Sequence, residues 1–417
     1  MQRIAAYMLV ALTMWFQAPA FAQDKIEGNE IPSILKTDKA IESEKSSKIP
    51  EWLSRIKIGG YLQLWWILTE DNENGKLQAF TLDEAAQETS GFSFNRARLT
   101  TEMKREHVRA KLELGLEGSP RLLDAYGAWK PQGLSLEVLA GQMKIPSTYE
   151  VNSASSNLDF ATRSKFSDEV VNWSLSRGPT VSSPIYGIKA YLRDTGIAAK
   201  GKAGPCEYHA MIGNGLGANL WVGGNEKRQY MYANDPGAYF YGVRLSCDFS
   251  RFIERNSKAP FFKKLTIGGH FNGNYHPNLI FKDEKTVLDI ERESWSVDFQ
   301  LNIMGRLRFT WMTGRGIVLD DFDNDDKIDY IYFGTEFKLI YVILPEQLEI
   351  GIRYDTYTEE FFENGSETAF DTYTFGATYT IKPDLRFQLN YKIKDLESRT
   401  APDIDDNILL LTAQLNF

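Results

Sequence analysis

The sequence predicts an all-β protein, a transmembrane antiparallel β-barrel of about 16 strands. From Arg55 onward, apolar and polar residues alternate in runs of about ten residues, and a period of two indicates strands with one apolar face. Short and long connections between these runs also follow one another along the chain. This asymmetry is typical of barrels with short turns at one rim and long loops at the other.

Both ends of the chain fit an exported barrel. Arg3 precedes an apolar run, Ile4–Phe16, and Ala20-Phe21-Ala22 has the form of a cleavage site. We therefore expect a signal peptide over residues 1–22 and a flexible or partly helical periplasmic leader over residues 23–54, with the barrel formed by residues 55–417. At the other end, Ile408–Phe417 alternates and finishes on an aromatic residue, which resembles the closing strand of bacterial outer-membrane barrels.

The composition agrees with strands that cross a membrane. Aromatic residues make up 13% of the chain, and the mean hydropathy is only −0.35, since a barrel gives the lipid every second residue. No apolar stretch after the leader is long enough for a transmembrane helix. The net charge of −9 argues against nucleic acid as a partner.

The alternation defines sixteen expected strands. They are Ile56–Leu68, Phe92–Met103, Val108–Glu117, Leu122–Lys130, Leu134–Ile145, Ile185–Asp194, Cys206–Gly213, Ala238–Phe249, Lys264–Tyr275, Ser294–Met304, Leu307–Thr313, Tyr330–Val342, Leu348–Tyr357, Thr372–Ile381, Leu385–Lys394 and Asn407–Phe417. Connections after even strands are mostly short, and we assign them to the periplasm. Ser250–Lys263 is the exception. The alternative architecture is a soluble multi-sheet protein.

The polar strand faces would line an aqueous lumen. Their expected inward cations outnumber their anions, which favours the passage of anions. The other interpretation is that these charges pair across strands and merely keep the lumen wet. The inward cations are Arg96, Arg98, Arg109, Lys111, Lys189, Arg193, Arg244, Arg308, Lys338, Arg353, Arg386, Lys392 and Lys394.

Residues 92–192 resemble the phosphate-selective porin family (porin O and P type). The resemblance rests on the order and spacing of five short motifs: Phe94-Asn95-Arg96-Ala97-Arg98-Leu99, Leu123-Asp124-Ala125-Tyr126, Gly141-Gln142-Met143-Lys144-Ile145-Pro146, Ser147-Thr148-Tyr149-Glu150 and Gly187-Ile188-Lys189. The resemblance implies a sixteen-stranded, trimeric outer-membrane channel.

In that family the loop after the fifth strand folds into the lumen and forms the constriction. By position this loop would be residues 146–184, with Arg163, Lys165 and Arg177 as anion contacts. The alternative is a surface loop with solvated charge. The sequence lacks the dense arginine ladder of the phosphate-specific members, so we expect a general or mildly anion-preferring pore, with phosphate among the candidate solutes.

Two further constellations remain outside this pore. Asp321, Asp323, Asp325 and Asp329 have the alternate spacing of a calcium loop, although its glycine and final glutamate are missing. Cys206 and Cys247, the two cysteines of the chain, fall at the periplasmic ends of neighbouring strands and could form a disulfide in that oxidising compartment.

No catalytic constellation emerges, because the four histidines are scattered and no hydrolase motif is present. We therefore expect a porin without cofactors that gives small hydrophilic solutes passive diffusion across the bacterial outer membrane. Its expected surroundings are outer-membrane lipid, lipopolysaccharide and two further copies of itself. The alternatives are a barrel with a structural or adhesin role and a barrel enzyme such as a phospholipase.

Overall fold

A computed structural model of the chain describes residues 55–69, 90–117, 120–169, 193–215, 239–255, 261–280, 287–320, 328–361, 366–382, 384–398 and 404–417. The chain divides into two units, Met1–Glu51 and Trp52–Phe417. The expected signal peptide and leader lie outside the described residues, as does the whole of the first unit. The fold is therefore that of the second unit.

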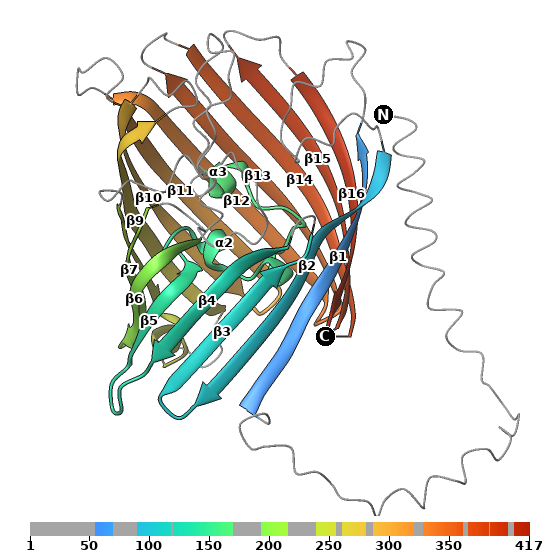
Figure 1. Cartoon of the computed structure of the whole chain (residues 1–417). Helices are drawn as coiled ribbons and strands as arrows, with labels where there is room; N and C mark the ends of the chain where they lie inside the picture. The colour runs from blue at the N-terminus through green and yellow to red at the C-terminus, as the bar shows by residue number, and fades with distance from the viewer. Residues whose placement is uncertain are drawn as a thin grey trace, which may run out of the picture. The chain divides into compact units, whose positions relative to one another are not determined.

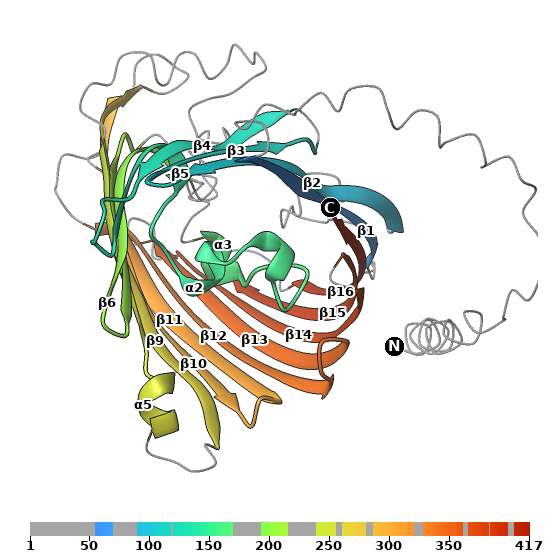
Figure 2. The ribbon, with the colours of Figure 1, turned by 90° about the horizontal axis from the view of Figure 1, so that it is seen from below.

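The described residues form one closed barrel of sixteen antiparallel strands, each paired with its neighbours in the sequence (Figures 1 and 2). The expected fold class is confirmed. The strands are β1 (Ile56–Thr69), β2 (Ser90–Arg105), β3 (Val108–Gly115), β4 (Arg121–Trp129), β5 (Leu136–Lys144), β6 (Arg193–Ala203), β7 (Cys206–Gly213), β8 (Tyr239–Asp248), β9 (Phe262–Ile280), β10 (Val287–Ile303), β11 (Leu307–Asp320), β12 (Ile328–Leu344), β13 (Leu348–Phe361), β14 (Ser366–Lys382), β15 (Leu385–Ser398) and β16 (Ile404–Asn416).

The last strand closes the barrel against the first, as the alternation at the end of the chain predicts. β1 pairs with β16 from Tyr61 opposite Asn416 to Thr69 opposite Ile408. Phe417 completes this seam, because its N–H donates to the Gly60 carbonyl at 3.1 Å and its carbonyl accepts from the Gly60 N–H at 2.9 Å. The closed sheet leaves no open edge, which the hydrocarbon core of a membrane requires.

The two faces of each strand differ in the way that a membrane barrel needs. On β10, Trp295 and Val297 are exposed on the outside, whereas Ser294, Ser296 and Asp298 are buried on the lumen side. This pattern repeats around the wall, so an apolar outer surface surrounds a polar interior. The protein is thus an outer-membrane β-barrel. None of the described helices is long and apolar enough to cross a membrane.

The sequence-based position of the sixth strand is wrong. We expected Ile185–Asp194, but β6 is Arg193–Ala203, and residues 185–192 lie outside the described part of the chain. The sequence of β6, RDTGIAAKGKA, consists mostly of small and polar residues. It has little apolar alternation, which explains why the more regular segment before it was preferred.

Several later strands are longer than expected. β10, for example, begins at Val287 instead of Ser294. Its added residues include Glu291, Arg292 and Glu293, which are hydrogen-bonded in register with β9 and β11. Apolar alternation marks only the lipid-facing belt of a strand, so the sequence underestimates the part that continues past that belt.

Candidate functional site

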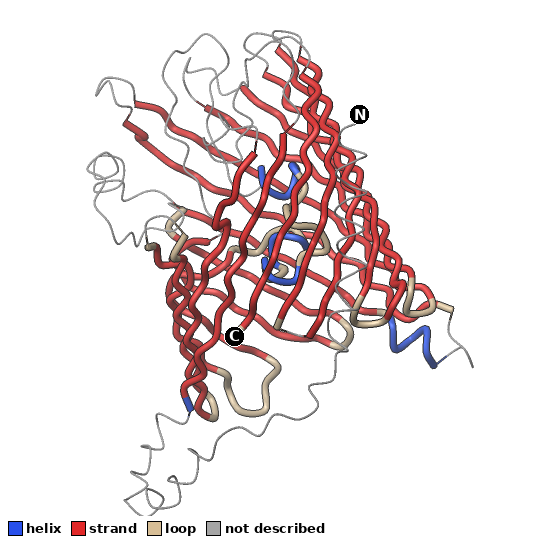
Figure 3. Tube along the Cα trace, turned by 90° about the vertical axis from the view of Figure 1, so that its right-hand side faces the viewer, coloured by secondary structure: helices blue, strands red, loops and turns tan. Residues whose placement is uncertain are grey.

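The chain leaves the wall after β5 and enters the lumen. The described part of this constriction loop, residues 145–169, contains α2 (Tyr149–Asn152), the 3-10 helix η5 (Ser155–Asn157) and α3 (Lys165–Glu169). Figure 2 shows α2 and α3 inside the ring of strands, and Figure 3 shows the same helices enclosed by the wall. Thr148 starts α2, because its hydroxyl accepts from the Val151 N–H at 3.2 Å.

Wall side chains hydrogen-bond to the irregular backbone of this loop. Arg386 on β15 donates to the carbonyls of Ser156 and Leu158 at 2.9 and 2.7 Å. The buried Asn390, four residues further along β15, accepts from the Ala161 N–H at 2.8 Å. Non-helical backbone at membrane depth needs hydrogen-bond partners within the protein. The lumen side chains of β15 therefore fix the position of this part of the loop.

Two aromatic side chains of the loop lie on glycines of the wall. Phe166 covers Gly314 on β11 and Gly334 on β12, and Phe160 lies beside Gly376 on β14. A Cβ added at Gly376 would be 2.7 Å from Cε1 of Phe160. Both rings are at most 2% exposed, so the absence of a side chain at these glycines makes room for the loop.

A buried ionic network anchors the loop to β12 and β13. Glu150 accepts from the backbone N–H and the hydroxyl of Ser164 at 2.8 and 3.1 Å. Its other oxygen lies 3.5 Å from the Lys338 ammonium and 3.9 Å from the Arg353 guanidinium. Burial alone would raise the pKa of the Glu150 carboxyl, but Lys338, Arg353 and the Ser164 N–H outweigh burial and lower this pKa to about 2.

Three of the expected anion contacts serve this anchoring. Arg353 bonds to Asp355 at 2.9 Å and to the Thr162 carbonyl of the loop at 2.8 Å. Arg308 is shared between Glu349 and the loop residue Asp159. Arg244 pairs with Asp298 at 2.7 Å and donates to the Ser147 carbonyl. Their charges are therefore already bound by carboxylates.

Three more expected contacts form ion pairs on the wall of β2–β5. Arg98 pairs with Glu117 at 2.7 Å. Arg109 lies between Glu137 and Glu102, and Lys111 lies between Glu113 and Asp124. The interpretation of these charges as cross-strand pairs describes this part of the lumen correctly.

Other lumen cations form no ion pair with a carboxylate. Arg96 donates to the amide oxygen of Gln63 at 2.8 Å and lies over the Trp65 ring. Arg163 donates to the Glu150 carbonyl and the Ser155 hydroxyl. Within the described residues, the buried and half-buried lumen cations without an ion pair include Arg96, Lys144, Arg163, Lys200, Arg386 and Lys392.

These cations influence one another across the lumen. The positive charge of Arg163 on the loop repels those of Arg96 on β2 and Lys144 at the end of β5. The negative charge of Asp168 on α3 attracts those of Arg96 and of Lys392 on β15. The loop therefore carries positive and negative groups into a region with cations on both sides.

Lys165, the other expected contact on the loop, is at the start of α3. Its ammonium lies 4.8 Å from the ring centre of Phe370 and 5.6 Å from that of Tyr357. Its backbone N–H donates to Asp355 at 2.9 Å. Aromatic faces attract cations, so Phe370 and Tyr357 help to hold the ammonium of Lys165 in place.

Several expected site residues cannot be located. Arg177 and Lys189, and Asp321, Asp323 and Asp325 of the possible calcium loop, lie outside the described residues. Asp329 belongs to β12, and its side chain is not described. Among the residues that are described, no cluster of three potential metal ligands occurs.

The sequence reasoning missed an apolar contact that holds the loop against the closing seam. Trp65 on β1, Ala161 on the loop and Leu410 on β16 pack together and are all buried. Leu410 is an apolar residue on the face of the last strand that carries the polar Thr412, Gln414 and Asn416. This exception was the available signal, since an apolar side chain facing a lumen needs a covering partner.

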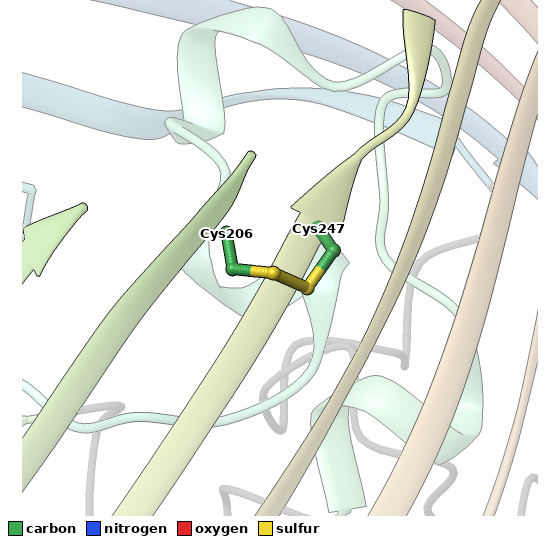
Figure 4. Close-up of a disulfide and its surroundings, with 2 residues drawn as sticks. All are labelled: Cys206 and Cys247. Carbon is green, nitrogen blue, oxygen red and sulfur yellow. A yellow bond between two sulfur atoms is a disulfide. The ribbon is translucent and has the colours of Figure 1, made fainter. Parts of the chain in front are cut away.

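The two cysteines lie at the rim of short turns and form a disulfide (Figure 4). Cys206 starts β7 and is directly opposite Cys247 on β8, with a Cα–Cα distance of 3.9 Å. By alternation both are on the outer face, because their neighbours His209 and Arg244 are buried on the lumen side. The bond is therefore separate from the pore lining.

Comparison with solved structures places this barrel among outer-membrane proteins. Similar structures include the anion-selective porin from Comamonas acidovorans (TM-score 0.57, 10% identity, 87% of this chain and 99% of that chain). They also include the outer membrane channel DcaP of Acinetobacter baumannii (0.55, 11%, 87% and 97%) and the trimer form of OmpT from Vibrio cholerae (0.55, 10%, 87% and 99%).

The chain has the barrel fold of outer-membrane porins. At identities this low, the likeness concerns the fold alone. No family model matches the sequence, and no curated protein matches it either. The solute must therefore be argued from the lumen of this chain.

Proposed function

We propose that this protein is an outer-membrane porin through which small hydrophilic solutes diffuse passively, with a preference for anions. The observation that carries the proposal is the set of lumen cations that form no ion pair within the described residues, Arg96, Arg163, Arg386 and Lys392 among them, around the constriction loop. Cations that are not neutralised lower the electrostatic cost of bringing an anion into a narrow passage.

The distribution of carboxylates supports this preference. Glu113, Glu117, Glu137, Asp298 and Glu349 are all bound to a lysine or an arginine. Their negative charge is compensated within the wall, so it does little to attract a cation into the lumen. We therefore propose a positive field inside the pore, although the chain as a whole is acidic.

The mouth at the short turns supports the same direction of selectivity. It opens into a cavity of about 680 Å³, whose lining includes Lys104, Lys130, Lys200, Lys202 and Arg244. Carboxylates such as Glu106 are fewer than basic residues in this lining. A basic mouth raises the local concentration of anions at the pore.

Reversal potentials in a potassium chloride gradient across a planar bilayer test the proposal. We expect a potential of the sign that chloride permeation produces. Arg96→Gln combined with Lys392→Gln should move this potential toward zero, because it removes two lumen cations that form no ion pair within the described residues.

A control removes the same charge outside the constriction. Arg306→Gln combined with Lys382→Gln alters two cations on exposed turns and should leave the potential near the unmodified value. Clear cation preference of the unmodified protein would contradict the proposal. Equal shifts in both double variants would show that the constriction does not set the selectivity.

We propose a general anion preference, with phosphate as one permeating anion. In the described lumen, neighbouring cations on one strand, such as Arg109 and Lys111 on β3, are each bound by carboxylates, so successive phosphate sites along an arginine ladder are not supported. Adding phosphate on one side should therefore leave the chloride conductance nearly unchanged. A strong block at low phosphate concentration would favour a specific site instead.

Three further expectations belong to this proposal. A passive pore needs no catalytic group and no cofactor, whereas a plugged structural barrel or a phospholipase would give no steady conductance.

We propose a homotrimer surrounded by phospholipid and lipopolysaccharide, which cross-linking in native membranes would test. Calcium binding by Asp321, Asp323, Asp325 and Asp329 stays a prediction, to be tested by isothermal titration.

A further inference from the structure

The connection between β8 and β9 differs from its neighbours at the rim of short turns. The connections after β2, β10 and β12 contain two or three residues each, whereas this one contains the helix α5, Ser250–Arg255. Figure 2 shows α5 on the outer side of the ring of strands, next to β9. Diffusion of a solute through the lumen does not require a helix on the outer side of the wall.

Hydrogen bonds hold α5 against β9 in a defined position. The carboxylate of Asp248, the last residue of β8, accepts from both the backbone N–H and the hydroxyl of Ser250. The same hydroxyl oxygen accepts from the Leu265 N–H of β9 at 3.2 Å, and the Phe249 N–H donates to the Leu265 carbonyl at 2.8 Å. The start of the helix is thus fixed to the barrel wall.

Three aromatic side chains are exposed on this connection. Phe252 on α5 is 69% exposed, and Phe261 and Phe262 at the start of β9 are 49% and 39% exposed. The rings of Phe261 and Phe262 meet edge to face at 5.1 Å. Water is an unfavourable surrounding for exposed phenylalanine rings, so these side chains indicate an apolar surrounding.

This aromatic surface is continuous with the lipid-facing belt. Phe262 is paired with Ile303 on β10, and the same outer face of β9 continues to the exposed Ile267. The backbone of Phe261 accepts from the Met304 N–H at 2.8 Å, and the Met304 side chain is also exposed. The surface therefore extends the apolar belt to the edge of the barrel.

Exposed cations accompany the aromatic residues. Arg251 precedes Phe252 on α5, and Lys263 follows Phe262 at a register shift of β9. Both side chains are exposed. A rim that carries aromatic rings and cations together matches the headgroup region of a bilayer, where apolar groups enter the acyl boundary and cations meet phosphates.

We propose that α5 and the Phe261-Phe262 pair form a membrane foot that lies in the periplasmic leaflet. In this arrangement Phe252, Phe261 and Phe262 enter the boundary between headgroups and acyl chains. Arg251 and Lys263 bind the phosphates of anionic phospholipids. The proposal rests on the outer-membrane location in the proposed function, but it does not depend on ion selectivity.

Spin labels on the full protein in lipid nanodiscs test the position of the foot. The natural cysteines are joined in a disulfide, so a label attaches at Phe252→Cys alone. Val243→Cys on the outer face of β8 provides a lipid reference, and Gln347→Cys in the exposed turn after β12 provides a water reference. We expect the label at position 252 to resemble the lipid reference, more accessible to oxygen than to a water-soluble nickel chelate.

These references separate two kinds of failure. If position 243 resembles position 347, the barrel is not in the bilayer and the proposed function fails. If position 243 reports lipid while position 252 resembles position 347, the foot alone is overturned. A foot that binds another protein, or a second copy of this chain, would give this second result in discs with one barrel each.

The lipid headgroup is tested with charge-reversed variants. Adding phosphatidylglycerol to phosphatidylcholine discs should move the label at position 252 deeper and lower its nickel accessibility. Arg251→Glu combined with Lys263→Glu should abolish this change. Arg306→Glu combined with Lys382→Glu, which reverses two exposed cations on other turns, should retain it. Loss of the change in both pairs, or in neither, would overturn the assignment of the anionic headgroup.

Discussion

The ring of Phe166 lies against Gly334 so closely that a Cβ at this glycine would overlap Cβ, Cγ and Cδ2 of the phenylalanine. Phe166 is fully buried on α3, and Gly334 is on the lumen face of β12. The constriction loop therefore depends on a missing side chain in the wall. Packed interiors do not accept even one extra carbon without a shift.

Gly334→Ala should displace the loop from the wall. Overpacking typically costs about 1–3 kcal/mol, and we expect Phe166 to move away from β12 toward the lumen. We expect a lower thermal stability and a lower single-channel conductance. Gly127→Ala is the matched control, because a Cβ at Gly127 meets no atom within 4 Å. Unchanged conductance and stability in Gly334→Ala would refute this account of the loop.

Lys338 and Lys392 form a natural pair for separating anchoring from selectivity. Both are lumen lysines with at most 8% exposure, but Lys338 lies within 3.5 Å of Glu150, Asp159 and Glu336. Lys338→Met removes the lysine that pairs with the buried Glu336, and breaking a buried ion pair typically costs about 3–5 kcal/mol. We expect a large loss of stability in urea unfolding.

Lys392→Met should have the opposite profile. In the described part of the chain Lys392 forms no ion pair, so stability should be nearly unchanged while the reversal potential moves toward zero. The two predictions are checked on the same preparations by unfolding and by bilayer recording. If Lys338→Met loses as much ion selectivity as Lys392→Met, the assignment of Lys338 to anchoring and of Lys392 to selectivity is contradicted.

The loop anchor at Glu150 should weaken at acidic pH. The pKa of this carboxyl is lowered from 4.5 to about 2 in the folded protein. A lowered pKa contributes stability that is present above the unfolded value and lost as pH falls through the folded value. Glu150→Gln should therefore be less stable than the unmodified protein at neutral pH. The difference should shrink between pH 4.5 and pH 2, as measured by thermal unfolding.

A stability difference that does not change with pH would show that another contact holds the loop. If the stability difference between the two proteins is constant from neutral pH to pH 2, the charge of Glu150 does not hold the loop. Because other carboxylates titrate in the same range, the comparison of the two proteins isolates the contribution of Glu150.

The wall could be predicted from the sequence because its signal is local. On β10, Trp295, Val297 and Phe299 alternate with Ser296 and Asp298, and each strand carries the same information within a few residues. β6 was missed because Ala198, Ala199 and Gly201 provide no apolar contrast. A strand can therefore be predicted from the sequence only when its own residues alternate clearly between apolar and polar.

The constriction could be predicted only in outline. The resemblance placed a loop after the fifth strand, but its contacts join residues far apart in the sequence. Asp159 meets Arg308 across 149 positions, and Ala161 meets Asn390 across 229. These pairs depend on the register of every intervening strand. Composition therefore indicated a cationic lumen but did not separate the bound cations from the others.

The disulfide should affect the stability of the barrel but not its conductance. Cys206 and Cys247 are 41 residues apart, and the bond lies on the outer face. Closing a loop of this length constrains the unfolded chain, with an effect of about 4 kcal/mol in the chain-entropy view. Replacing both cysteines by alanine should lower the urea midpoint and leave the single-channel conductance unchanged. Dithiothreitol should lower the midpoint of the unmodified protein and have no effect on the variant. A conductance change in the variant would instead mean that the ends of β7 and β8 help to shape the pore.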